Sequence, residues 1–275
     1  MRKYLLKKII VAVLSLVLSA SMLLTGCGDS GSKADNSWDK VKEKGEFVLG
    51  LDESFPPMGF KDDKGEIVGF DIDTAREVCS RLGVELKIQP ISWDAKEQEL
   101  NTGNIDCIWN GFTITDERKE NVLFTKPYMN NRQVLVVKED SPYNDIKDLE
   151  GKKLGLQSES SAVDALDANE DFKAKLKEVI LFDENMMAIM DLEKGGVDAL
   201  LIDEIVIRYY MQTKGNNFKI FDKELSHEEY GVGFRKGDKK LMKKVEETLE
   251  AMSKDGKLTE ISTKWFDRDI VTIKK

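Results

Sequence analysis

Histidine is almost missing from this chain, with His227 as the single example among 275 residues. Histidine is the most common catalytic base and a frequent zinc ligand, so its scarcity argues against a Ser-His triad and a histidine-based metal site. A glycine-rich phosphate loop is missing as well. The composition therefore favours a binding protein over an enzyme, and we expect no cofactor and no metal.

Cysteine is also rare, with three residues. Cys79 falls within a helical pattern and Cys107 within an apolar strand pattern, which is typical of buried free thiols. A disulfide between the two stays an open alternative, because pairing cannot be deduced from sequence.

The third cysteine, Cys27, ends an N-terminal segment with the anatomy of a secretion signal. A basic head precedes an apolar run over residues 9–24, which is somewhat shorter than the roughly 20 residues of a membrane-spanning helix. Residues 24–27, Leu-Thr-Gly-Cys, resemble the bacterial lipobox, which implies removal of residues 1–26 and lipidation of Cys27. We expect residues 27–37, which are small and polar, to form a flexible tether.

The net charge restricts the partners of the mature chain. Removing the four basic residues of the signal from 42 Lys and Arg leaves 38 against 51 Asp and Glu, a net charge of about −13. This argues against nucleic acid or an anionic lipid surface as a partner. We therefore expect membrane contact only through the lipid on Cys27, on the outer face of the cell membrane (the periplasmic side in a Gram-negative host).

From residue 46 onward, short apolar strands alternate with amphipathic helices, which predicts an α/β fold. Strand patterns cover 46–52, 84–89 and 104–111, and a helical pattern covers 71–83. That helix places apolar residues on one face and ends at a glycine, as helices commonly do.

The same plan occurs twice. Residues 99–110 align without gaps on 191–202, and 48–54 resemble 153–159, which indicates two topologically similar lobes. The alternative is that two helix–Gly–strand turns follow the same stereochemistry independently. In either case four strands end in polar loops, at Asp52, Asn110, Gln157 and Asp203. Open α/β sheets bind ligands at such strand ends, so facing lobes would bring these loops to one cleft.

Two extended apolar segments, 131–138 and 229–236, suit a pair of strands that cross between the lobes. We expect lobe 1 to comprise 38–132 and 230–275, and lobe 2 to comprise 133–229. The helical periodicity near the C-terminus predicts packing back onto lobe 1.

The segment "NGFTITDER" (110–118) contains an electrostatic anomaly. Thr115 is a good helix cap, and the two acids after it suit the positive end of a helix dipole. Arg118 lies in the same first turn, where a cation is disfavoured. It is either a surface residue paired with Asp116 or Glu117, or one side of a site for a ligand anion.

Over residues 38–267 the chain resembles the polar-amino-acid substrate-binding proteins of ABC importers. The resemblance is carried in order by "FPPMGF", "GEIVGFDIDTA", "SWDAKEQELNTGNIDCIWNGFTITDER", "LFTKPY", "LEGKKLGLQS", "DLEKGGVDALLID", "EYGVGFRKGD" and "DGKLTEISTKWF". It implies a two-lobed periplasmic-binding-protein-like fold of type II, closing on a free L-amino acid by a hinge motion. It also implies a permease and its ATPase as partners, and a monomer suffices for this mechanism.

The resemblance also implies roles for particular residues. Arg118 and Thr113 would hold the ligand carboxylate, for which arginine offers a planar pair of donors. Asp203 would hold the α-ammonium group, although an aspartate there could equally cap the next helix. The other positions that match ligand-contacting residues are Asp52, Phe55, Trp93, Asn110, Gly111, Gln157, Ser160 and Ser161.

Each of these assignments has a plainer alternative. Gly111, whose backbone carbonyl or amide would face the ligand, could be an ordinary turn glycine. Ser160 and Ser161 could cap a helix, and Phe55 and Trp93 could be core aromatics rather than walls around the ligand side chain.

Asp52, Glu53 and Glu159 make the predicted pocket acidic, which favours arginine or lysine as ligand. A neutral polar amino acid such as glutamine or cystine is the alternative, and Asn110 departs from the serine that basic-amino-acid binders tend to have. Two other functions share the fold: an enzyme of the cyclohexadienyl dehydratase type and an amino-acid sensor. The enzyme is not favoured, because the acidic residues have no recognisable catalytic spacing. The sensor stays an alternative that gene neighbourhood would separate, since adjacent permease and ATPase genes favour import.

Overall fold

The computed structural model describes residues 35–215 and 217–273. The predicted signal peptide, Cys27 and the tether up to residue 34 lie outside these residues. Within them, no helix has the length and apolar character needed to cross a membrane. The first helix, α2, begins at Ser37, the last residue of the predicted tether.

The first five-stranded sheet has the order β5-β1-β6-β13-β7. Its strands are β1 (Glu46–Leu51), β5 (Glu85–Pro90), β6 (Cys107–Ile108), β7 (Val122–Phe124) and β13 (Gly233–Arg235). A small sheet accompanies it, with β2 (Ser54–Phe55), β3 (Gly59–Lys61) and β4 (Ile67–Val68). The helices of this lobe are α2 (Ser37–Lys44), α3 (Phe70–Leu82), η1 (Trp93–Ala95), α4 (Lys96–Thr102), α5 (Asp116–Asn121), α10 (Lys239–Lys254) and α11 (Lys257–Phe266).

The second five-stranded sheet has the order β10-β9-β11-β8-β12. Its strands are β8 (Met129–Lys138), β9 (Lys153–Gln157), β10 (Glu178–Phe182), β11 (Ala199–Asp203) and β12 (Phe218–Tyr230). Its helices are η2 (Ile146–Leu149), α6 (Ser161–Asp167), α7 (Glu170–Lys173), α8 (Asn185–Lys194) and α9 (Glu204–Lys214). The predicted two α/β lobes are confirmed.

The two lobes repeat one plan. In each sheet the second strand in the order, β1 or β9, runs parallel to its neighbours on both sides. The aligned segments 99–110 and 191–202 form α4–β6 and α8–β11, and each helix ends at a left-handed glycine, Gly103 and Gly195. Because parallel strands share a direction, their carboxyl ends lie at the same edge of each sheet.

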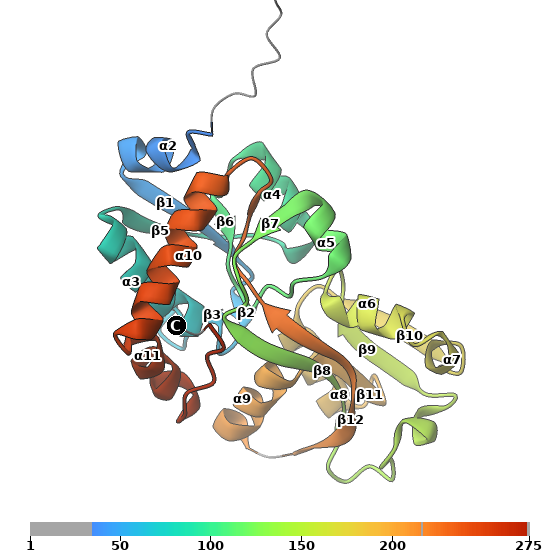
Figure 1. The fold of residues 1–275 in the computed structure, drawn as a ribbon. Coiled ribbons are helices and arrows are strands. Elements are labelled where there is room, and N and C mark those ends of the chain that lie inside the picture. The colour runs from blue at the N-terminus through green and yellow to red at the C-terminus, as the bar shows by residue number, and fades with distance from the viewer. Residues whose placement is uncertain (1–34, 216, 274–275) are drawn as a thin grey trace, which may run out of the picture. The chain divides into compact units, whose positions relative to one another are not determined.

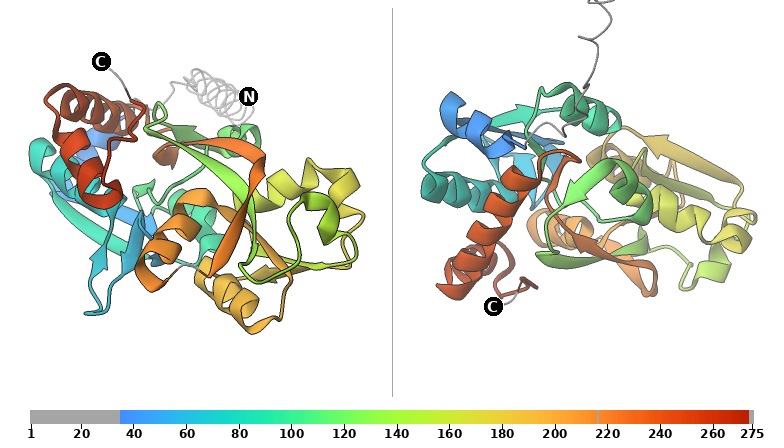
Figure 2. Two further views of the ribbon diagram at one scale, coloured as in Figure 1. Left: turned by 90° about the horizontal axis from the view of Figure 1, so that it is seen from below. Right: turned by 45° about the horizontal axis from the view of Figure 1, so that its top comes forward.

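Two long antiparallel strands, β8 and β12, link the lobes (Figures 1 and 2). They pair from Met129 with Tyr230 to Lys138 with Phe218. The predicted segment 229–236 does pass from one sheet to the other, but it is two strands rather than one: residues 229–230 end β12 and residues 233–235 form β13. After Tyr230 the backbone N–H of Gly231 donates to Phe112 O, so the chain turns into the first sheet as β13.

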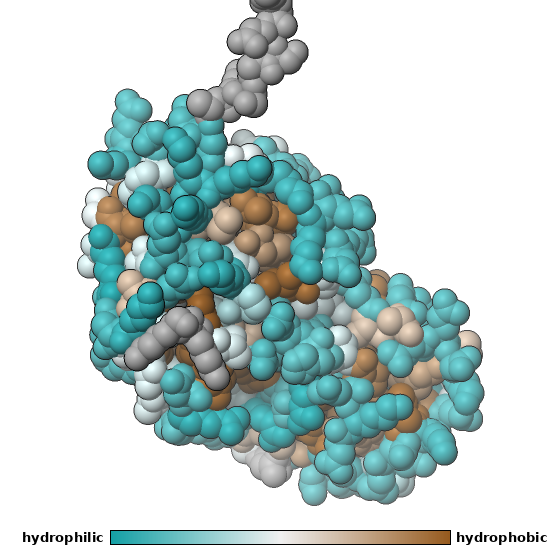
Figure 3. All heavy atoms as spheres, in the orientation of Figure 1, coloured by the Kyte–Doolittle hydropathy of each residue, from teal (hydrophilic) through white to brown (hydrophobic). Residues whose placement is uncertain are grey.

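The hydrophobic core follows the predicted helix faces. In α3 the residues Ile72, Ala75 and Val78 are fully buried. The buried residues of α10 include Leu241 and Val245, which agrees with the helical periodicity expected near the C-terminus. Each fully buried aliphatic side chain contributes about 1.5–3 kcal/mol to folding. Cys79 and Cys107 are both buried and free. Hydrophilic residues cover most of the face shown in Figure 3.

Candidate functional site

The strand ends of the two sheets are in direct contact. Gln157, at the end of β9, donates a hydrogen bond from Nε2 to Asp52 Oδ2 at 2.9 Å, and Asp52 directly follows β1. Asn110, after β6, accepts a hydrogen bond from the Asp52 backbone N–H at 3.1 Å. Three of the four predicted strand ends therefore meet between the lobes.

Arg118 is a buried cation with no carboxylate partner. It lies on α5, whose predicted cap is present because Thr115 Oγ1 accepts a hydrogen bond from the Arg118 backbone N–H. Its side chain is only 7% exposed and donates to Thr113 O at 2.9 Å and to Glu159 O at 3.3 Å. Burial lowers its pKa. No acidic oxygen of the described residues lies within 4.0 Å of it, which excludes the interpretation as a surface ion pair.

A second cation, Lys96, lies at the same place and was not predicted. Lys96 is 5% exposed and donates from Nζ to Glu159 O at 3.0 Å and to Trp93 O at 3.2 Å. Burial, and then the charge of Arg118, lowers the pKa of Lys96 to about 8. Glu159 has a left-handed φ of 51° and contributes its backbone carbonyl, while its side chain is exposed. This end of the site is therefore positively charged.

Asp203 lies at the opposite, negatively charged end. Its Oδ1 accepts hydrogen bonds from Asn131 Nδ2 and from Tyr230 OH, each at 2.6 Å. It stands in the N-cap position of α9, but its side chain makes no capping hydrogen bond. The Asp203 carboxylate is therefore held by Asn131 and Tyr230 and not by a capping bond to α9. Burial raises the pKa of Asp203.

Glu228 lies beside Asp203 and was also missed by the sequence analysis. It is 5% exposed, and its Oε2 accepts from Asn131 Nδ2 at 2.8 Å and from Gln133 Nε2 at 3.1 Å. Burial, and then the charge of Asp203, raises the pKa of Glu228 to about 7. The signal that could have found it is strand periodicity, since residues two apart on β12 share a face with buried Tyr230.

Thr113 connects the two ends of the site. Its carbonyl accepts from Arg118, while its hydroxyl donates to Glu228 Oε2 at 3.1 Å and accepts from Ser161 Oγ at 3.2 Å. Ser160 instead donates to Gln157 O at 2.7 Å, and neither serine caps α6 through its side chain. Residues from both lobes thus share one hydrogen-bond network.

Gly111 lies close to an aromatic wall. A Cβ at this position would lie 2.7 Å from a ring atom of Phe55, and φ is +57°. Its backbone N–H donates to Asp71 Oδ2 at 2.7 Å. The amide is therefore not free to bond a ligand, and of the two predicted ligand contacts only the one through the Gly111 carbonyl is still possible. Asp71 also accepts from Tyr128 OH at 3.0 Å. Burial raises the pKa of Asp71 to about 7.

The aromatic residues are buried around this network. Phe55 is 6% exposed and Trp93 is 9% exposed. Trp93 packs edge-on against Phe112, with ring centroids 5.7 Å apart, and Phe112 lies 4.7 Å from the Arg118 guanidinium. Both aromatic residues are therefore part of the packing around this network.

The end of the site near Asp52 is acidic. Burial raises the pKa of Asp52 to about 6, opposed by hydrogen bonds from Gln157 and Ser54, and Glu184 and Glu53 add negative charge nearby. Ser54 Oγ donates to Glu184 Oε2 at 2.8 Å across the two lobes. Glu53 is paired with Lys61 at 2.8 Å.

Residues 47–268 match the model of the bacterial extracellular solute-binding proteins, family 3. The chain belongs to this family. An L-cystine-binding protein of Escherichia coli K12, TcyJ, is 31% identical over 96% of this chain and 97% of its own length. The L-arginine-binding protein of Pseudomonas aeruginosa is 32% identical over 81% of this chain and 88% of its own length.

A solved structure adds to the comparison. An ABC uptake transporter substrate-binding protein from Streptococcus pneumoniae with bound histidine superimposes with a TM-score of 0.84 at 42% identity. The match covers 87% of this chain and 99% of that one. The family thus includes binders of different amino acids, and membership alone does not define the ligand.

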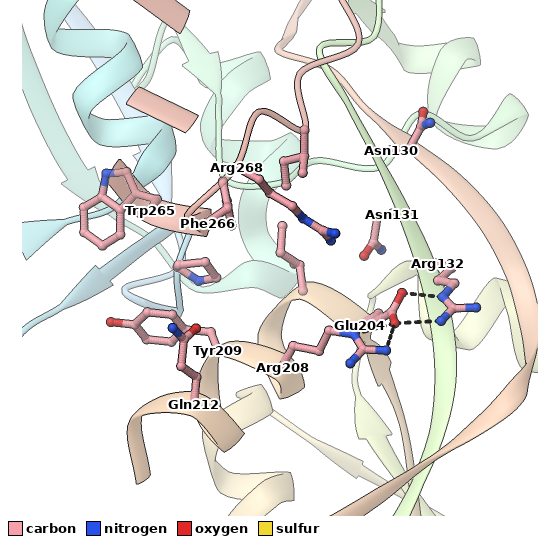
Figure 4. A pocket seen from close by; sticks show the side chains of 13 residues that line it. Asn130, Asn131, Arg132, Glu204, Arg208, Tyr209, Gln212, Trp265, Phe266 and Arg268 are labelled. Atoms are coloured by element: carbon pink, nitrogen blue, oxygen red, sulfur yellow. Dashed lines mark hydrogen bonds and ion pairs between the residues drawn. The ribbon is translucent and has the colours of Figure 1, made fainter. Parts of the chain in front are cut away.

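A cavity of about 650 Å³ is lined by residues next to Asp203, including Asn131 and Glu204 (Figure 4). Glu204, the first residue of α9, is held there between Arg132 of β8 and Arg208, and it bonds both guanidinium groups. Hydrogen bonding from Arg132 lowers the pKa of Glu204. The pair with Arg132 joins the start of α9, next to Asp203, to β8, whereas the pair with Arg208 lies within α9.

Among residues 35–215 and 217–273 no group of three or more His, Cys, Asp or Glu side chains is arranged to hold a metal ion. The site instead offers hydrogen-bond donors at one end and acceptors at the other. Such an arrangement suits a small polar ligand with separated charges.

Proposed function

We propose that this protein binds a free L-amino acid between its lobes. The observation that carries the proposal is the pair of uncompensated charges on either side of Thr113. Arg118 is a buried cation without a carboxylate, and Asp203 is a buried carboxylate without a cation. A zwitterion, with its carboxylate on Arg118 and its ammonium on Asp203, would neutralise both, and burying unpaired charges is otherwise costly.

Further residues support the two ends of the ligand. Lys96 adds positive charge where the carboxylate would lie, and the Thr113 and Ser161 hydroxyls lie between the two ends. Gly111 would offer its carbonyl, because its amide is held by Asp71. Phe55 and Trp93 would enclose the ligand side chain.

We propose a basic amino acid, arginine or lysine, as the ligand. Asp52, with Glu184 and Glu53 nearby, gives the far end of the site a negative potential that suits a guanidinium or an amine. Asn110 and Gln157 would contribute polar contacts there. The similarity to an arginine-binding protein supports this choice.

Cystine is the second candidate, and glutamine is a third. The similarity to an L-cystine-binding protein favours cystine. Its second ammonium group would be attracted to the end of the site near Asp52, while its second carboxylate would be repelled there. A neutral ligand such as glutamine would gain less from that charge.

Binding would shift the protein toward a closed form in which both lobes contact the ligand. β8 and β12 would serve as the hinge between lobe 1 (38–132 and 230–275) and lobe 2 (133–229). The closed monomer, anchored by a lipid on Cys27 outside the cytoplasmic membrane, would deliver the amino acid to an ABC permease driven by its ATPase. The ligand would leave chemically unchanged, as in the substrate-binding relatives rather than in an enzyme.

A thermal-shift screen tests this proposal. The mature protein would be heated with each of the twenty L-amino acids, L-cystine and D-arginine as a stereochemical control. Bound ligand stabilises the folded protein by mass action and so raises its unfolding temperature. At a ligand concentration of one hundred times Kd, the free energy of unfolding rises by about 2.7 kcal/mol. We expect the largest increase with L-arginine or L-lysine. A protein that responds to none of these compounds would contradict the proposed function.

A further inference from the structure

Two buried carboxylates in the site share one hydrogen-bond donor. Asn131 Nδ2 lies 2.6 Å from Asp203 Oδ1 and 2.8 Å from Glu228 Oε2. Both carboxylates are 5% exposed, and neither has a Lys, Arg or His nitrogen within 4.0 Å in the described part of the chain. They come from different strands, β11 and β12, so the pairing is a product of the fold.

The surroundings of this pair contain more acceptors than donors. The NH2 groups of Asn131 and Gln133 both donate to Glu228. The amide oxygens of these residues, Asn131 Oδ1 and Gln133 Oε1, are buried and accept no hydrogen bond from the described residues. The nearby cation, Arg118, donates to backbone carbonyls instead. A group with several N–H donors and a positive charge would satisfy these acceptors.

We propose that Glu228 and Asp203 together form the cation subsite for the α-ammonium group of the ligand. Without ligand, the two carboxylates hold one proton between them, and the arriving ammonium displaces that proton to solvent. This inference rests on the proposed function, and it adds Glu228 as a ligand-binding residue and proton release as a step of binding.

The physical basis is repulsion between neighbouring buried charges. Two carboxylates that share a site do not both ionise readily, and one of them keeps a proton to a higher pH. The raised pKa of Glu228, about 7, agrees with this. An ammonium group supplies the positive charge that the proton supplied before, so both carboxylates can then be ionised.

The other charged and titratable groups around Asp203 and Glu228 do not account for the released proton. Tyr230 donates to Asp203, and its pKa is raised far above the neutral range by burial. Arg118 stays protonated across the relevant range. Glu204 forms ion pairs with Arg132 and Arg208. Asp71 accepts hydrogen bonds from Tyr128 OH and from the Gly111 amide on the lobe 1 side.

The sign of the pH dependence follows directly. Below about pH 7 the pair holds its proton, so the ligand must displace it and the affinity falls as the pH falls, by up to about tenfold per pH unit. Above about pH 7 the pair is ionised before binding, and the affinity levels off. The affinity therefore increases with pH and then reaches a plateau.

Isothermal titration calorimetry of the full mature protein measures this proton directly. The probe is whichever of L-arginine, L-lysine, L-cystine and L-glutamine binds most tightly; L-histidine is left out because its imidazole titrates in the same range. Titrations at about pH 6 in two buffers with different heats of ionisation give the number of protons released. We expect close to one proton for the wild type and close to none for Glu228→Gln.

His227→Gln is the matched control, because His227 is the neighbouring residue on β12 and is exposed. This variant should release as many protons as the wild type. Glu228→Gln should also lose the pH dependence of Kd, so that it binds more weakly than the wild type at high pH and approaches it near pH 6. A merely structural role of Glu228 would not change the number of protons.

The outcomes separate the two proposals. If the wild type binds one of the probes without releasing a proton, or if Glu228→Gln releases as many protons as the wild type, the carboxylate-pair inference is wrong and the proposed function stands. If none of the four probes binds, the proposed function is contradicted and this inference falls with it.

Discussion

Replacing Arg118 by alanine removes the group on which the proposed ligand carboxylate depends. Arginine and a carboxylate form two parallel charge-assisted hydrogen bonds, and each hydrogen bond to a charged group is worth about 1.5–3 kcal/mol. Losing both should cost about 3–6 kcal/mol of binding free energy, which is a factor of roughly 150 to 20,000 in Kd.

The same substitution should change the stability of the ligand-free protein much less. Arg118→Ala removes two hydrogen bonds to carbonyl oxygens and a contact 4.7 Å above the Phe112 ring, which is a loss. It also removes the cost of burying an unpaired charge, which is a gain. We expect the two effects to offset each other to within about 2 kcal/mol.

The assay combines calorimetric Kd values with urea unfolding of the ligand-free protein. Arg76→Ala is the control, because it removes the same charge from an exposed arginine on α3 paired with Asp73. We expect the control to bind like the wild type. If Arg118→Ala retains a Kd within threefold of the wild type, the carboxylate is held elsewhere and the assignment is wrong.

Three further substitutions test other parts of the site. Asp203→Asn should weaken binding about tenfold or more in calorimetry, because the ammonium loses a counter-charge; an unchanged Kd would remove Asp203 from the site. Asp52→Asn should weaken L-arginine more than L-glutamine in the same assay, and equal effects would contradict the role of Asp52 at the far end of the ligand. Gly111→Ala should lower the free energy of unfolding by about 2 kcal/mol or more, since its Cβ would lie 2.7 Å from Phe55. Gly65→Ala is its control, with a φ of +80° but no atom within 4 Å; equal losses for the two variants would mean that the contact with Phe55 costs nothing.

The sequence was sufficient for features set by local stereochemistry. The cap at Thr115, the apolar face of α3 and the repeated helix–glycine–strand units each depend on residues close together in the chain. The end of the crossing strand at Tyr230 was not predictable in this way. It depends on a hydrogen bond from Gly231 to Phe112, more than one hundred residues away in the chain.

The site shows the same limit. The resemblance to known binding proteins drew attention to Arg118 and Asp203, which match a motif. Lys96 and Glu228 have no such motif, and as isolated charged residues they would be expected at the surface. Lys96 donates to Glu159 of the other lobe and Glu228 accepts from Thr113 of the other lobe, so these contacts depend on how the lobes pack.

The most direct test of zwitterion recognition compares three forms of one ligand by calorimetry. These are the tightest-binding L-amino acid, its C-terminal amide, which lacks the carboxylate, and its N-acetyl derivative, which lacks the ammonium. We expect both derivatives to bind at least about one hundred times more weakly, since each leaves Arg118 or Asp203 buried without its counter-charge. If either derivative binds as tightly as the free amino acid, the two uncompensated charges beside Thr113 are not the ligand-binding site.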